Sequence, residues 1–175
     1  MKKMIAALRS FLTALLILTC FQLFAQKTDE VKLVEKTSYD GILNGILKEG
    51  SIIKTASFHY YILDEDVKLA AGINNPTITI NKVGKKNQML IQGIDNPVKC
   101  HRESDVVDTQ FKGNFSGWTG STSFSFMNGE TWVQDEPGIK NYNIFQPKVL
   151  IYRTSDGYRM KIEGVNELLL VKKNN

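Results

Sequence analysis

The sequence PKVLIYRTSDGYRMKIEG, residues 147–164, is the key to the fold, because the chain carries a second version of it, PTITINKVGKKNQMLIQG, at residues 76–93. Extended outward without a gap, residues 61–102 overlay residues 132–173 with 8 identities in 42 pairs. Farther upstream, Gly41 and Gly45 match Gly113 and Gly117 after a slip of one residue. A repeat at a fixed offset indicates a duplicated structural unit. We call residues 41–102 copy one and residues 111–175 copy two.

Both copies alternate apolar and polar residues. In Thr77–Asn81 and again in Tyr158–Glu163, every second residue is apolar, as in a strand with one buried face. Gly93-Ile94-Asp95-Asn96 and Gly164-Val165-Asn166-Glu167 follow at equal positions and predict hairpin turns, since Gly, Asn and Asp tolerate a positive φ. We expect an all-β fold: two tandem copies of a small SH3-like or OB-like barrel of about 60 residues each.

The predicted organisation has five parts. These are a signal peptide (1–25), a lead-in segment (26–40), copy one (41–102), a linker (103–110) and copy two (111–175). The lead-in either begins a short helix at Thr28 or is merely a polar connection. No low-complexity segment separates the copies, so we expect them to touch.

The N-terminus has the pattern of an export signal. Lys2, Lys3 and Arg9 precede an apolar run from Phe11 to Phe24 that ends at Ala25. This run is short for a membrane span, so we favour cleavage over a retained anchor. Cys20 offers a second alternative, lipidation, which we do not favour because Phe21 to Phe24 continue the apolar run. We expect a periplasmic or secreted protein.

Removal of residues 1–25 changes both charge and cysteine content. It leaves 19 basic and 18 acidic residues, which argues against a nucleic-acid partner or docking on an anionic membrane, and no stable membrane span is expected after cleavage. Cys100 remains as the only cysteine, so no intramolecular disulfide can form. We predict that Cys100 is a small buried hydrophobe, with a reactive thiol or an intermolecular bridge as the alternative.

Copy two also carries a set of spaced motifs. They are Gly113-x-Phe115-x-Gly117-Trp118, Asn128-Gly129-x-x-Trp132-x-Gln134, Pro147-Lys148-Val149-x-Ile151-Tyr152 and Tyr158-x-x-Lys161-x-Glu163-Gly164. Residues 111–173 thereby resemble an uncharacterised family of exported bacterial small β-domains. Glu130 stands where that group usually has Gln, and copy one lacks both Trp. The resemblance implies a small β-domain and an envelope address, and it implies no catalytic residue.

Candidates for chemistry are few. Ser116 is one residue too late for a nucleophile elbow, and Cys100 and His101 point to opposite faces of a strand. Asp64-Glu65-Asp66 and Asp135-Glu136 recur after an aromatic residue, but they lack the oxygen count of a calcium loop. We therefore predict no catalytic residue, no metal and no cofactor.

The two copies differ on one face. Thr79, Asn81, Pro97 and Lys99 of copy one correspond to the apolar residues Leu150, Tyr152, Leu168 and Leu170 of copy two. Such a patch marks either a binding surface or a face that packs on copy one or on the N-terminal segment, and the oligomeric state stays open. The predicted binding residues are these four together with Trp118 and Trp132.

The predicted function is a non-catalytic binding or structural module of the bacterial cell envelope, whose partner is an envelope protein or a glycan. The alternative is an enzyme or enzyme inhibitor with a site between the copies, using His59, the loop acids, or both.

Overall fold

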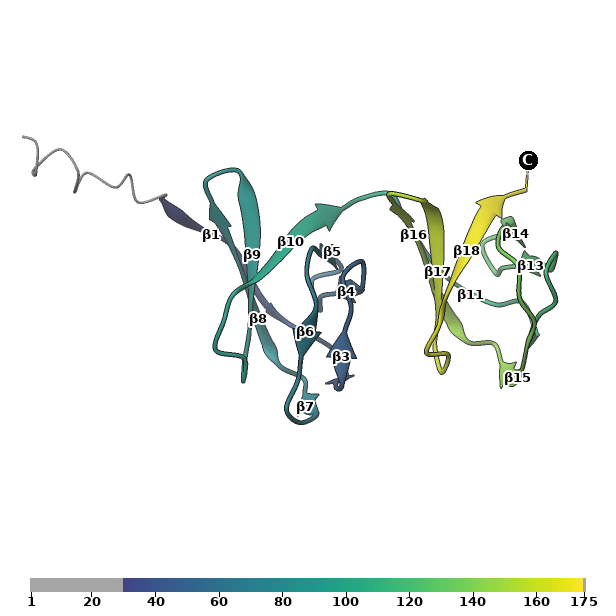
Figure 1. The fold of residues 1–175 in the computed structure, drawn as a ribbon, viewed down its shortest axis with the longest axis horizontal. Helices are drawn as coiled ribbons and strands as arrows, with labels where there is room; N and C mark the ends of the chain where they lie inside the picture. The colour runs from purple at the N-terminus through teal and green to yellow at the C-terminus, as the bar shows by residue number, and fades with distance from the viewer. Residues whose placement is uncertain (1–29, 175) are drawn as a thin grey trace, which may run out of the picture. The chain divides into compact units, whose positions relative to one another are not determined.

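The computed structural model describes residues 30–174, and within them the fold is all-β (Figure 1). Strands β1 to β18 occur in this range without a helix, so the predicted all-β class is confirmed. Accordingly, the described part of the chain contains no helix with the length and apolar character needed to cross a membrane. The predicted signal peptide and Cys20 lie outside the described residues.

The first large sheet has six strands in the order β1-β8-β9-β10-β5-β4. Their bounds, in that order, are Val31–Ser38, Thr77–Val83, Lys86–Ile91, Val98–Glu103, Tyr60–Leu63 and Ile52–Lys54. Two short ribbons accompany the sheet, one pairing β2 (Ile42–Leu43) with β7 (Ile73–Asn74), the other pairing β3 (Ile46–Leu47) with β6 (Val67–Lys68).

The second large sheet also has six strands, in the order β11-β16-β17-β18-β14-β13. Their bounds, in that order, are Val106–Gln110, Lys148–Thr154, Gly157–Ile162, Leu168–Lys173, Thr131–Gln134 and Ser123–Ser125. One ribbon accompanies it, formed by β12 (Asn114–Trp118) and β15 (Lys140–Phe145).

Equivalent residues of the two copies occupy equivalent places in these ladders. Met89 lies opposite Ile80 in the β8–β9 pair, and Met160 lies opposite Ile151 in the β16–β17 pair. In each sheet the last three strands of the copy form an antiparallel meander, β8-β9-β10 and β16-β17-β18, whose second turn contains Gly93 or Gly164 at positive φ. The predicted hairpin turns are confirmed.

The two outer strands of each sheet approach one another. An isolated bridge joins Tyr39, after β1, to Thr55, after β4. The second sheet has the same contact between Phe111, after β11, and Phe126, after β13. The two sheets thus curl until their outer strands are in backbone contact, which hides the exposed edges that an open sheet would leave.

The core lies on the faces that the alternation predicted. Ile78, Ile80, Met89 and Ile91 are buried in the first sheet, and the corresponding residues of the second sheet are buried as well, namely Val149, Ile151, Met160 and Ile162. Cys100 packs in the first core, as predicted for a small hydrophobe. Burial of the Cys100 thiol, aided by the nearby Asp64, raises its pKa to about 12.

Two segments expected to be connections are strands. Residues 31–38 of the lead-in form β1 rather than a helix, because pairing with β8 satisfies the backbone in an extended conformation and outweighs a weak local helix signal. Residues 106–110 of the linker form β11 and pair with β16 along their whole length.

Candidate functional site

Tyr152 of copy two lies against copy one. Its side chain is 0% exposed and clusters with Ile52 of β4 and Ile62 of β5. Leu150 packs at the edge of the same cluster. The Tyr152 hydroxyl donates a 3.0 Å hydrogen bond to the Gly50 carbonyl oxygen. This part of the apolar face therefore contacts copy one, which was one of the two predicted alternatives.

A polar group borders this apolar cluster. Asp108 of β11 accepts a 2.7 Å hydrogen bond from the Tyr60 hydroxyl and forms an ion pair with Lys54. Burial of the Tyr60 phenol and its contact with Asp108 raise its pKa. These contacts join the second sheet to β4 and β5 of the first.

The other two leucines of the predicted face are only half-buried. Leu168 lines a cleft between the two sheets. Leu170 packs beside Gly157: a Cβ added at Gly157 would lie 3.1 Å from the Leu170 Cδ1 methyl group. The amide of Leu170 donates a 3.0 Å hydrogen bond to Glu136.

Trp118 and Trp132 belong to the core of copy two. Trp118 packs beside Phe115 and Tyr142, and Trp132 makes an edge contact with Tyr158. Both indoles are buried, so they do not present a surface to a ligand in this conformation.

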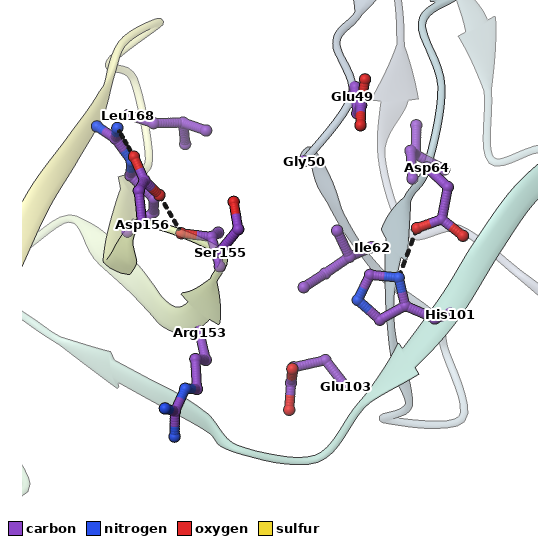
Figure 2. A pocket seen from close by; sticks show the side chains of 13 residues that line it. Glu49, Gly50, Ile62, Asp64, His101, Glu103, Arg153, Ser155, Asp156 and Leu168 are labelled. Carbon is purple, nitrogen blue, oxygen red and sulfur yellow. Dashed lines mark hydrogen bonds and ion pairs between the residues drawn. The ribbon is translucent and has the colours of Figure 1, made fainter.

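A cleft of about 810 Å³ lies beside the apolar cluster (Figure 2). Asp64, His101 and Glu103 stand on one wall, and Arg153 and Asp156 stand on the other. The His101 side chain is 53% exposed and its Nδ1 lies 2.6 Å from an Asp64 oxygen. Hydrogen bonds from Thr154 and Arg159 lower the pKa of Asp156. The side chains of Asp64, His101, Arg153 and Asp156 are exposed to water, whereas a group activated for catalysis is usually desolvated.

The recurring loop acids make the same contacts in both copies. Glu65 accepts a 2.7 Å hydrogen bond from the amide of Lys99, just as Glu136 accepts one from the amide of Leu170 at the equivalent position. A matched pair of side-chain contacts lies beside these bonds: Asp64 contacts His101, and Asp135 forms an ion pair with Lys172 at the equivalent position. Each acidic pair thus ties its loop to the last strand of its sheet.

His59 lies away from the cleft, in a network around Glu35 of β1. Its Nδ1 is 2.9 Å from Glu35 Oε2, and the same oxygen accepts a 2.8 Å hydrogen bond from the Tyr61 hydroxyl. Burial alone would raise the pKa of the Glu35 carboxyl, but the bonds to His59 and Tyr61 outweigh it and the pKa is lowered. The network joins β1 to the turn after β4 and to β5.

A second hollow, of about 730 Å³, has Phe58 at its rim, and we call it the Phe58 groove. Its lining residues are Ser38, Tyr39, Asp40, Lys54, Thr55, Ala56, Phe58, Asn75, Asp108, Lys148, Val149, Leu150, Lys161 and Glu163. The volume lies in the range typical of small-ligand sites.

Phe58 has an unusual backbone. Its φ is 61°, and its amide donates a 2.9 Å hydrogen bond to the Thr55 carbonyl in a tight turn. Copy two builds the same turn with Gly129, whose φ is 85°. A residue with a Cβ costs about 1–2 kcal/mol in this region. The Phe58 ring is 73% exposed, and its contact with the Lys54 ammonium, 5.3 Å from the ring centroid, returns about 0.5–1 kcal/mol.

Sequence reasoning missed both Phe58 and the groove. A signal for Phe58 was present, since continuing the same offset a few residues upstream of residue 61 places this bulky residue opposite Gly129. Alternation places Lys161 on the outward face of its strand, yet Lys161 is half-buried and lines the groove, because β17 turns this face toward copy one. Its equivalent in copy one is Leu90.

No group of three or more His, Cys, Asp or Glu side chains in residues 30–174 is arranged to hold a metal ion. Comparisons with protein-family models, with curated proteins and with solved structures found no match to this chain.

Proposed function

We propose that this chain is an exported, non-catalytic binding or structural module of the bacterial cell envelope, built from two tandem SH3-like or OB-like barrels of about 60 residues each. The equal strand order of the two sheets and the matching bridges at Tyr39 and Phe111 support the two-barrel architecture. The apolar run after Lys2, Lys3 and Arg9 supports export.

The observation that carries the non-catalytic role is the matched use of the loop acids. Glu65 and Glu136 each accept a hydrogen bond from a backbone amide of the last strand, and Asp64 and Asp135 each contact a nitrogen-bearing side chain two residues farther along that strand, His101 or Lys172. A catalytic acid or base acts in one site and needs its own environment. Side chains that make the same contact in both copies stabilise the fold of each copy.

The packed contact between the copies supports a binding role. The cluster of Tyr152 with Ile52 and Ile62 holds the cleft of Figure 2 and the Phe58 groove in a defined geometry. Preformed hollows lower the ordering cost of binding.

The experiment is capture from an envelope extract on immobilised protein, with elution by excess free protein. We expect a saturable partner that His59→Gln and Asp64→Asn variants still retain. The proposal fails if no partner is held, or if an extract component is consumed over time and its consumption stops in either variant.

The alternative, an enzyme or enzyme inhibitor with a site between the copies, is favoured by one observation. The cleft in Figure 2 brings His101, Asp64 and Glu103 opposite Arg153. His101→Gln separates the two functions, because a non-catalytic module keeps its partner and an enzyme loses turnover.

A further inference from the structure

Among the residues that differ between the copies, two that line the Phe58 groove, Phe58 and Lys161, carry the inference. Phe58 replaces Gly129 of copy two, and Lys161 replaces Leu90 of copy one. Each departure breaks a local rule, since a bulky residue takes a glycine conformation and a cation takes a half-buried strand position. The contact of Phe58 with Lys54 returns less than its backbone conformation costs, and positions that break a local rule for so little structural gain tend to be functional.

The scaffold does not explain Phe58. Its ring stands in solvent rather than in either core, and the turn forms equally well around Gly129. The Phe58 ring presents an exposed apolar face to the groove. A short, hydrogen-bonded turn fixes the position of the residue. Such a face suits a flat, partly apolar ligand surface.

Lys161 offers a positive charge without an acidic partner. Its ammonium lies 3.4 Å from the carbonyl oxygen of Ile52, and none of the ion pairs among the described residues includes it. Burial lowers the pKa of this ammonium, because its charge is poorly solvated. An anionic ligand group beside Lys161 would restore the missing interaction.

The remaining lining residues narrow the ligand class. Ser38, Asp40, Asn75 and Glu163 also line the groove and add hydrogen-bonding groups to it. A peptide that binds by strand addition needs an unpaired sheet edge. Beside the groove, however, the outer strands of the first sheet meet at the Tyr39–Thr55 bridge. The lining therefore favours a ligand with many hydroxyl groups, an apolar ring face and a carboxylate.

We propose that the Phe58 groove binds a carboxylate-bearing saccharide, with the Phe58 ring packed on the apolar face of one sugar and the Lys161 ammonium paired with a sugar carboxylate. This inference rests on the proposed binding function and names its ligand class.

The test is titration calorimetry of the purified protein with tetrasaccharides of galacturonate, glucuronate and mannuronate, and with their methyl esters. The esters keep the ring and remove the charge. We expect at least one acid to bind and its ester to bind about tenfold more weakly. Failure of all three acids to bind overturns the proposal.

Two variants imitate the opposite copy. Phe58→Gly should weaken acid binding about tenfold without lowering the melting temperature, since it relieves the turn. Lys161→Leu should weaken acid binding by a similar factor and abolish the preference over the ester. Phe145→Asn is the matched control, because Phe145 is equally exposed on β15 outside the groove and has Asn74 as its counterpart. Acid binding that is unchanged in Phe58→Gly or in Lys161→Leu overturns the proposal.

The capture experiment distinguishes failure of the saccharide inference from failure of the proposed binding function. If an envelope partner is held but no saccharide binds, the partner occupies another surface and only the saccharide inference fails. The saccharide inference also fails, and the binding function stands, if a captured protein or peptide displaces no saccharide and binds the Phe58→Gly variant as tightly as the wild type. If neither a partner nor a saccharide is held, the binding function itself fails.

Discussion

The hydroxyl of Tyr152 donates a 3.0 Å hydrogen bond to the carbonyl oxygen of Gly50, which lies 102 residues earlier in the chain. The Tyr152 ring fills the space between Ile52 and Ile62, so one side chain supplies both the apolar and the polar contact between the copies. Burial of the Tyr152 phenol raises its pKa, and the group therefore stays a neutral donor across the physiological range.

Tyr152 variants should separate these two contacts. Tyr152→Phe keeps the ring and should cost about 1 kcal/mol, the usual value of one hydrogen bond. Tyr152→Ser also opens a cavity and should cost about 3–5 kcal/mol. Urea melts measure both. The control is Tyr158→Phe, which removes an exposed hydroxyl bonded to Asp105 and should change stability by about 0.5 kcal/mol or less. Equal losses in all three variants would contradict the assigned interface.

Core truncations should be matched between the copies. Ile91 and Ile162 are equivalent and each 1% exposed, so Ile91→Ala and Ile162→Ala should each cost about 2–5 kcal/mol. Ile139 is 68% exposed, and Ile139→Ala should stay within about 0.5 kcal/mol. Chemical denaturation of the three variants checks this. A large loss at Ile139, or none at Ile162, would refute the assignment of the inward face.

Two glycines of copy two should respond differently to a methyl group. At Gly117, where φ is 102° beside the irregular pairing of β12 with β15, an added Cβ would lie 1.9 Å from the Lys140 carbonyl oxygen. Gly117→Ala should therefore cost about 3 kcal/mol or more. Gly120 has a similar φ of 105° with open space around it, so Gly120→Ala should cost only about 1–2 kcal/mol. If melting temperatures fell equally, the close approach at Gly117 would be absent.

Glu35 should make stability depend on acid pH. Its pKa is lower in the folded chain than its ordinary value of 4.5, so its contribution is fully present above that value. The contribution is lost as the pH falls through the lower folded-state pKa. Unfolding free energy measured from pH 6 down to about pH 3 should drop more steeply in the wild type than in Glu35→Gln. The Glu35 side chain is only 11% exposed, which limits solvent screening. Identical slopes would exclude this linkage.

Much of the fold follows from local patterns. Alternation at Ile78 and Ile80 identifies the inward face, because successive side chains of a strand point to opposite sides. Gly93 and Gly164 mark the turns, because their positive φ is cheap only for glycine. The lead-in and the linker were not predicted to contain strands. These short polar segments form β1 and β11 only because β8 and β16 supply backbone hydrogen-bond partners for them.

The candidate sites depended on contacts between distant segments. Alternation places Leu150 and Tyr152 outside the core of copy two, but it does not say whether copy one or another molecule covers them. In the same way, two strand-end Trp residues suggested ligand contacts, while the aromatic packing of copy two encloses both.

Four features follow from the amino-acid sequence alone, because each depends on strand periodicity or on the conformational freedom of single residues. They are the all-β class, the inward faces, the turns and the placement of Cys100 in the core. Three further features emerge only from the folded arrangement: Tyr152 is covered, Trp118 and Trp132 are core residues, and Phe58 and Lys161 line one groove. These outcomes depend on how curled sheets bring residues far apart in the chain into contact, and no local pattern encodes that geometry.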